Sequence, residues 1–252
     1  MAESGEPPRG RTLPVFPLST VLFPGQMLPL HIFEQRYRQM VADCLQAAAP
    51  EFVVALIESG DEVVEGRGSP DRPAQVATPH AVGTIARIAQ AGQFADGRYL
   101  LVCAGTERVR LRRLIAGAPY LQGEVEALED QDEPGAAGNT GALAASVREA
   151  LRQLLAEVTD ALPKENDKRR EQLSEAARTL PAEPAALAFF AARVLFTASE
   201  PEKQRLLEAN SIERRLTLAL RLLERERDLA RRAGALASLP PPAQGMSPLS
   251  LN

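Results

Sequence analysis

Residues 12–37, TLPVFPLSTVLFPGQMLPLHIFEQRY, contain the pattern that decides the fold. Three short apolar runs within this stretch predict two or three strands, separated by prolines and by a turn at Pro24-Gly25. From Phe33 to Leu45 apolar residues recur every three or four positions, which predicts a first helix with one buried face. The stretch therefore supplies strands and a helix that pack together, and nothing in it is typical of catalysis.

The rest of the first half also predicts β structure. Four segments are rich in β-branched residues or alternate apolar with polar side chains, and each predicts a strand: 52–57, 82–91, 99–114 and 121–128. Asp96-Gly97 lies between the second and third segments, and an Asp-Gly pair favours a tight hairpin turn. This pattern alone indicates an antiparallel sheet with one helix.

The second half predicts helices. Residues 129–141 are acidic and glycine-rich, which predicts an exposed linker. Helical periodicity follows in five segments: 141–162, 164–179, 185–196, 202–209 and 212–232. The second of these is so charged that we expect an exposed helix, and Ser199 with Glu202 fits a capping box before the fourth.

The chain is therefore expected to have five parts. They are a flexible leader (1–11), a β subdomain (12–130), a linker (131–141), a helical subdomain (142–232) and a disordered tail (233–252).

Three blocks of this sequence resemble the amino-terminal domain of Lon proteases. The first is carried by Leu13, Pro14, Leu18, Phe23, Pro24, Pro29 and Leu30. The second is carried by Val82, Gly83, Thr84, Gly105, Arg108, Pro119 and Tyr120. The third is carried by Lys203, Gln204, Leu206, Leu207, Glu208, Ile212, Glu213, Arg214 and Leu216. The blocks occur in the order of that domain and span about residues 12–230.

The resemblance implies an α+β fold, in which a PUA-like, twisted antiparallel β pseudo-barrel precedes a carboxy-terminal α-helical bundle. In the family this domain recognises protein substrates and helps the oligomer assemble. The resemblance therefore implies a stand-alone domain that binds unfolded or partner polypeptide. Its expected role is that of an adaptor or regulator of ATP-dependent proteolysis, with a Lon protease as a candidate partner.

The catalytic parts of a full Lon protease have no counterpart in this sequence. No Gly-Lys pair is present, so the phosphate-binding loop G-x-x-x-x-G-K-[ST] is absent. A serine–lysine pair needs a buried lysine of lowered pKa, but Lys164, Lys168 and Lys203 all lie in charged helical segments. His31 and His80 have no cysteine at metal-ligand spacing. We therefore expect a protein that is not an enzyme and holds neither a metal nor another cofactor.

Composition limits the location and the partners. A net charge of −4 argues against nucleic acid as a general partner. There is no signal-peptide core, and no apolar run approaches the roughly 20 residues of a membrane span. We therefore expect a cytoplasmic protein without a membrane partner. Cys44 and Cys103 fall on predicted apolar faces, which favours reduced thiols in the core.

Two surfaces are candidates for binding, and the first is apolar. Phe23 and Met27 flank the proline-glycine turn, while Phe94 and Tyr99 flank the hairpin turn. Exposed apolar patches often mark partner sites, so these four residues form the predicted peptide-binding site. The competing interpretation places Phe23 and Met27 in the core and makes Phe94 an isolated surface aromatic.

The second candidate surface is a row of arginines: Arg108, Arg110, Arg112 and Arg113. PUA-like folds in other families bind RNA, and arginines on one strand face could contact phosphates, which makes RNA binding the alternative function. The competing interpretation is a solvated strand face paired with Glu124 and Glu126 on the neighbouring strand.

Overall fold

The computed structural model describes residues 11–60, 77–115, 119–131, 137–163 and 165–235. The predicted leader and tail lie outside these ranges, except for Arg11 at one end and residues 233–235 at the other.

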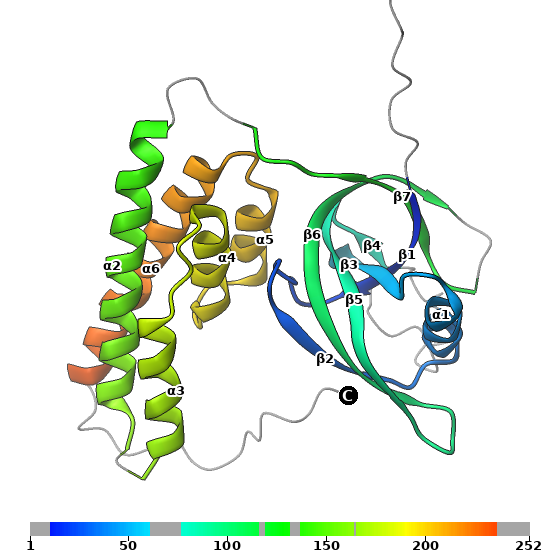
Figure 1. The fold of residues 1–252 in the computed structure, drawn as a ribbon, viewed down its shortest axis with the longest axis horizontal. Helices are drawn as coiled ribbons and strands as arrows, with labels where there is room; N and C mark the ends of the chain where they lie inside the picture. The colour runs from blue at the N-terminus through cyan, green and yellow to red at the C-terminus, as the bar shows by residue number, and fades with distance from the viewer. Residues whose placement is uncertain (1–10, 61–76, 116–118, 132–136, 164, 236–252) are drawn as a thin grey trace, which may run out of the picture.

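Seven strands form one sheet: β1 (Arg11–Leu18), β2 (Met27–Ile32), β3 (Glu51–Ser59), β4 (Thr78–Pro79), β5 (Val82–Gln93), β6 (Tyr99–Ile115) and β7 (Gln122–Ala127). Strands β1, β7, β6, β5 and β3 are hydrogen-bonded in that order, and β1 also pairs with β3. These five strands therefore close into a barrel, seen on the right of Figure 1. The predicted twisted, antiparallel pseudo-barrel is confirmed, with one parallel pair, β1 with β3.

The long strand β6 organises the sheet. Strand β5 pairs with one edge of β6. On the other edge, β2 pairs with the first half of β6 and β7 with the second half of β6. The hairpin between β5 and β6 turns at Asp96-Gly97, as predicted, and Gly97 has a φ of 83°. The first half of β6 thus forms a three-stranded sheet, β2-β6-β5, with β2 and the second half of β5. This sheet runs down to the hairpin in Figure 1.

The opening stretch differs from the sequence prediction in three places. Strand β1 continues through Pro17, which lies opposite Ala55 of β3, because proline has an extended φ and lacks only the N–H donor. The run 21–23 is not a strand but a buried loop. Phe33 is not part of the first helix, α1 (Gln35–Gln46), and instead lies exposed before Glu34, the residue that precedes its first turn.

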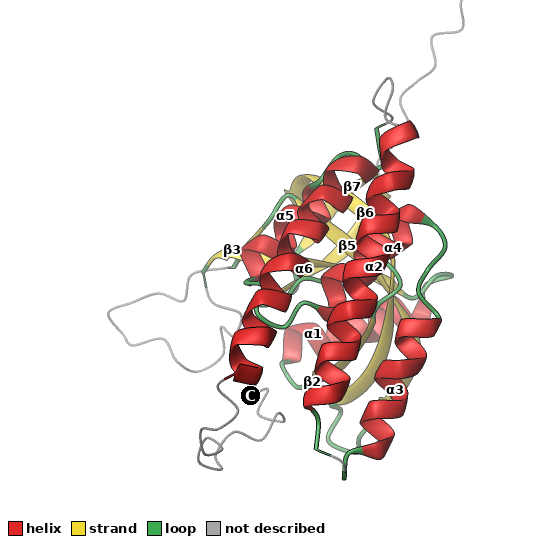
Figure 2. Cartoon of the chain, turned by 90° about the vertical axis from the view of Figure 1, so that its left-hand side faces the viewer, coloured by secondary structure: helices red, strands yellow, loops and turns green. Residues whose placement is uncertain are grey.

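Five helices follow the barrel: α2 (Ala137–Ala161), α3 (Asp167–Arg178), α4 (Pro184–Val194), α5 (Glu200–Glu208) and α6 (Ile212–Ala235). Helix α2 begins at Ala137, inside the segment predicted as linker. Helices α4 and α5 lie between the barrel and the long pair α2 and α6 (Figures 1 and 2). Helix α3 has no buried residue, in agreement with its predicted exposure. None of the described helices is long and apolar enough to span a membrane.

Helix α1 packs against the inner face of the β2-β6-β5 sheet. Its buried side chains share one core cluster with strand residues such as Phe16, Phe52 and Leu101. Cys44 and Cys103 lie in this cluster as free, buried thiols, as predicted. Burial raises the pKa of Cys44 to about 11 and that of Cys103 to about 12, so both thiols stay protonated and poorly reactive.

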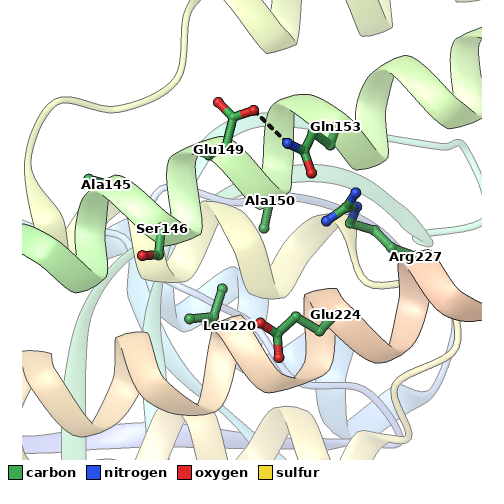
Figure 3. A pocket seen from close by; sticks show the side chains of 8 residues that line it. All are labelled: Ala145, Ser146, Glu149, Ala150, Gln153, Leu220, Glu224 and Arg227. Carbon is green, nitrogen blue, oxygen red and sulfur yellow. Dashed lines mark hydrogen bonds between the residues drawn. The ribbon is translucent and has the colours of Figure 1, made fainter.

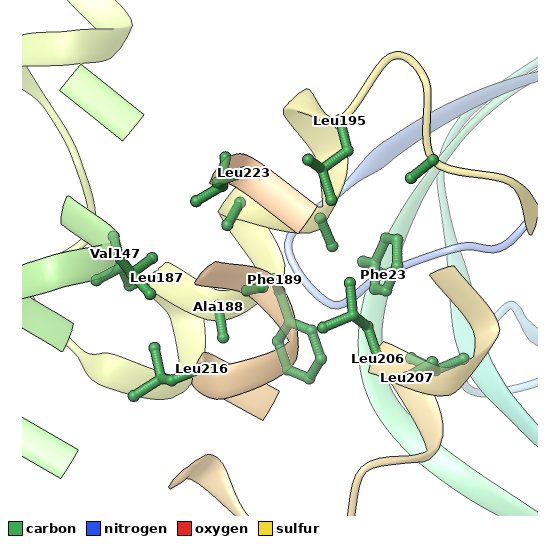
Figure 4. Packing of buried hydrophobic residues seen from close by; sticks show 14 of the residues in the cluster. Phe23, Val147, Leu187, Ala188, Phe189, Leu195, Leu206, Leu207, Leu216 and Leu223 are labelled. Atoms are coloured by element: carbon green, nitrogen blue, oxygen red, sulfur yellow. The ribbon is translucent and has the colours of Figure 1, made fainter. Parts of the chain in front are cut away.

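The loop before β2 joins the barrel to the helices. Phe23 is 1% exposed, and its ring lies 6.0 Å from that of Phe189 in α4 (Figure 4). Two contacts hold the loop on the barrel: the Thr84 hydroxyl donates to the Leu22 carbonyl at 2.6 Å, and the Gly25 N–H donates to the Gly105 carbonyl at 2.8 Å. One hydrophobic core therefore extends from the barrel into the bundle.

Gly105 is required by the close approach of that loop. A Cβ at this position would overlap the Phe23 carbonyl oxygen, which is backbone and cannot move aside. Gly25 is required for a different reason, because its φ of 74° is costly for a residue with a side chain. Gly105, one of the residues that carry the family resemblance, therefore has a packing role at the junction between barrel and bundle.

We expect Phe23→Ala to lower the free energy of unfolding by about 3–5 kcal/mol, because it opens a cavity in the core that barrel and bundle share. Phe94→Ala is the control, since Phe94 is 47% exposed, and should change stability by no more than about 0.5 kcal/mol. Urea unfolding followed by circular dichroism measures both. Equal effects of the two variants would contradict the role given to Phe23.

Candidate functional site

The outer face of the β2-β6-β5 sheet carries an apolar surface. Side chains at every second position of β2 point outward and lie opposite the outward residues of β6, with Pro29 opposite Val102 and His31 opposite Leu100. We call the outward group the apolar strip: Met27, Pro29, His31, Phe33, Phe94 and Leu100. The alternation of side chains along a strand is what separates this strip from the core on the other face.

The hairpin end of the strip is aromatic. The His31 ring lies 6.1 Å from the ring of Phe33 and 6.1 Å from the ring of Phe94. The guanidinium of Arg98 lies over the Phe94 ring, with its carbon 5.5 Å from the ring centre. Residues from β2, from the segment before α1 and from the hairpin thus form one cluster, and Phe94 is not an isolated surface aromatic.

The strip is unusually exposed for its composition. Met27 is 54% exposed, Leu100 51%, Phe94 47% and Phe33 42%. Together they are half of the large apolar side chains that are exposed in the described part of the chain. Exposed apolar side chains are common singly on protein surfaces, but several on one sheet face indicate a binding surface.

The structure separates the residues of the predicted peptide site. Met27 and Phe94 lie on the apolar strip, whereas Phe23 and Tyr99 are buried and cannot contact a ligand without rearrangement. Tyr99 faces inward because it neighbours Leu100 on β6 and successive side chains point to opposite faces.

The predicted peptide-binding site did not include three residues of the apolar strip, Leu100, His31 and Phe33. The signal was available, because MLPLHI and YLLVCA place apolar residues on both faces of two adjacent strands. Two apolar faces need two partners, and only one of them is covered by α1. Nothing in the sequence indicates which face remains uncovered.

The predicted arginine row does not form a continuous surface. Arg108 is buried, and its guanidinium donates to the carbonyl oxygens of Leu207 at 2.7 Å and Ala209 at 2.8 Å. Burial, followed by the neighbouring Arg215, lowers the pKa of Arg108 to about 10, so it remains charged at neutral pH. An arginine held in this way is not available to a phosphate.

The outer arginines of the row are ion-paired. Arg112 donates to Glu126 at 2.6 Å, and Arg113 pairs with Glu124. The competing interpretation of a solvated strand face, with arginines and glutamates paired across strands, is therefore confirmed for these two residues. Each arginine already has a carboxylate that would have to be displaced before it could bind RNA.

Asp130 lies between two buried arginines and connects the subdomains. It accepts from Arg108 of β6 at 2.6 Å and binds Arg215 of α6 through both oxygens, one at 3.1 Å. Both guanidiniums also lie over the Phe189 ring, with the carbon of Arg215 4.5 Å from its centre. One carboxylate thus contacts two guanidiniums that the fold removes from water, and its charge offsets one of their two positive charges.

We expect Asp130→Asn to destabilise the protein by about 3–5 kcal/mol, because it leaves buried guanidinium charge without a counter-ion. Glu124→Gln removes a carboxylate from an exposed pair instead and should cost less than about 1 kcal/mol. Urea unfolding at neutral pH compares them. A cost for Asp130→Asn as small as that of the control would show that the cluster contributes little to stability.

A hollow lies between α2 and α6 (Figure 3). Its volume is about 450 Å³, and it is lined by polar and small side chains, among them Glu149, Gln153 and Arg227. Gln153 is already occupied by a hydrogen bond to Glu149 at 2.6 Å. No group of His, Cys, Asp and Glu side chains in the described residues is arranged to hold a metal.

The structure is thus an α+β domain in which a barrel and a helical bundle leave one apolar sheet face exposed among the described residues. Residues 12–225 match the family described as the ATP-dependent protease La (LON) substrate-binding domain. The match extends over most of the chain, which therefore belongs to this family. The resemblance noted in the sequence is confirmed.

Curated relatives include the Lon protease of Anaeromyxobacter dehalogenans, 28% identical over 90% of this chain, and Lon protease 2 of Myxococcus xanthus, 29% identical over 90%. The chain spans about a quarter of the length of each. Among solved structures, the Lon N-terminal domain protein from Xanthomonas campestris is similar with a TM-score of 0.52 and 26% identity, covering 83% of this chain and 97% of that one. The N-terminal domain of the Mycobacterium avium complex Lon protease shares the fold, with a TM-score of 0.59 and 19% identity, covering 85% and 98%.

Proposed function

We propose that this domain binds polypeptide substrates by holding extended, apolar segments on the apolar strip. The observation that carries the proposal is the grouping of Met27, Phe33, Phe94 and Leu100 on one sheet face without a covering element among the described residues. The family description, a substrate-binding domain, supports a polypeptide as the ligand.

An extended segment suits the shape of the strip. The outward side chains of β2 and β6 repeat every second residue, as do the side chains of an extended peptide. Unfolded chains expose such segments, whereas folded proteins bury them, so the strip distinguishes the two states of a client by its apolar contacts. The proposed function is binding, with no chemical step assigned to the described residues.

The expected affinity is modest. Full burial of one large apolar side chain contributes about 1.5–3 kcal/mol, and those of the strip are already about half buried. The cost of association reduces the sum further. We therefore expect dissociation constants between about 1 μM and 1 mM, which suits a domain that must release its client.

The relatives suggest the wider role. They are Lon proteases that match this chain over only part of their length. We propose that the domain delivers bound polypeptide to ATP-dependent proteolysis of the Lon type, as an adaptor or regulator. The RNA alternative is not carried forward, because three of its four arginines are buried or ion-paired.

We expect the double variant Met27→Gln, Phe94→Ser to bind a labelled extended peptide of alternating Phe, Leu and Ser about tenfold more weakly than the unaltered protein. Leu229→Ser is the control, because Leu229 is 42% exposed but lies on α6 of the helical bundle. Fluorescence anisotropy measures the affinities. A loss that is equal in the control would refute the strip as the site.

Salt provides a second readout in the same assay. Apolar binding should change less than about threefold between 0.05 and 0.5 M salt, because it releases no counter-ions. Labelled single-stranded RNA serves as the comparison ligand. RNA binding that is tighter than peptide binding, and that falls steeply with salt, would contradict the proposed function.

A further inference from the structure

We propose that the apolar strip selects apolar segments flanked by acidic residues. The inference rests on the proposed function and adds the charge of the substrate to it. It follows from the arginines at the two ends of the strip. Their charge is positive, whereas the net charge of the protein is negative. The complete chain has a net charge of −4.

Arg193 of α4 stands at the end of the strip next to Met27. Its guanidinium donates to the carbonyl oxygen of Gly25, two residues before Met27, and lies over the Phe190 ring at 5.1 Å. It forms no ion pair with a carboxylate in the described part of the chain. Burial lowers its pKa, which indicates that its charge is only partly solvated. A carboxylate on a ligand would offset this cost.

Arg38 of α1 stands at the opposite end. Its guanidinium packs against Gly97 at the hairpin tip, where a Cβ would overlap it. Arg98 lies beside it, so the tip holds two guanidiniums and one carboxylate, Asp96. Asp96 is engaged by Arg98 at 2.7 Å, and the charge of Arg38 also acts on Asp96, although Arg38 has no carboxylate within ion-pair distance among the described residues. The tip therefore has an excess of positive charge.

The carboxylates nearest the strip do not cancel these charges. Glu51 is shared between Arg11 and Arg87, at 2.7 Å from each. Glu34 is buried and binds Arg36 at 2.9 Å. Each of these acids is already paired with an arginine, so neither is available to offset the charge of Arg193 or Arg38.

The spacing fits a short extended peptide. Strand β2 has six residues, a length of about 17–20 Å at 3.3 Å per residue. An apolar segment of about six residues would cover the strip, and one acidic residue on each side would reach Arg193 and Arg38. Basic flanks would place like charges together at both ends.

The test uses three labelled peptides with one apolar core of about six residues, flanked by Asp, by Ser or by Lys. Exposed ion pairs contribute about 0.2–1 kcal/mol each, so two of them should make the Asp-flanked peptide bind about 2- to 30-fold more tightly than the Ser-flanked one at low salt, and the Lys-flanked peptide should bind more weakly still. The difference should shrink at high salt, because the flanks are solvated. The protein is the full chain, and anisotropy gives the dissociation constants.

Variants assign the preference to the two ends. Arg38→Glu should abolish or reverse the preference at the hairpin end, and Arg193→Gln should reduce it at the other end while retaining a donor for the Gly25 carbonyl. Arg178→Glu is the matched control for the first, because it makes the same charge change on exposed helix α3 and should leave the preference unaltered. Circular dichroism confirms that each variant is folded.

The outcomes separate the two proposals. Equal binding of all three peptides would overturn the acidic preference and leave the proposed function standing. Absence of binding to every peptide would overturn both. Sedimentation that shows a dimer, lost in Met27→Gln, would assign the strip to a second copy of this chain and would also overturn both.

Discussion

The packing of Phe23 against Phe189 is the contact on which the rest of the structure depends. It lies in the hydrophobic core that the barrel and the helical bundle share, to which Val21, Leu56 and Val82 also contribute from the barrel side. The same loop leads directly into β2, so the core contact also fixes where the apolar strip begins. Removing water from large aromatic surfaces is the principal source of this stabilisation, and it requires both subdomains to be in place.

Electrostatics then sets the orientation of the two parts. Arg108 and Arg215 are buried beside Phe189, and Asp130 is the counter-ion of both. A buried ion pair of this kind adds little net stability but is costly to break, so it penalises other arrangements of barrel and bundle. Hydrophobic contact thus supplies most of the stability, and the charged cluster favours one relative orientation of barrel and bundle.

The surface left over by this arrangement is the one that we assign to binding. Helix α1 covers the inner face of the β2-β6-β5 sheet, while α4 and α5 cover the barrel near Phe23. The outer face of β2 and β6 has no such cover among the described residues. The proposed binding of unfolded clients needs an exposed apolar surface, and the described residues of the barrel and the bundle leave one.

The sequence by itself determined the α+β class, the hairpin at Asp96-Gly97, the capping box of Ser199 and the membership of the family, because each depends on residues close together in the chain or on a motif. Only the tertiary structure decided the closure of the barrel by β1 and β3, and which apolar residues face water. Met27 is exposed and Phe23 is buried although only three residues separate them. Periodicity reports the two faces of a strand, but which face is covered depends on elements that are distant in sequence.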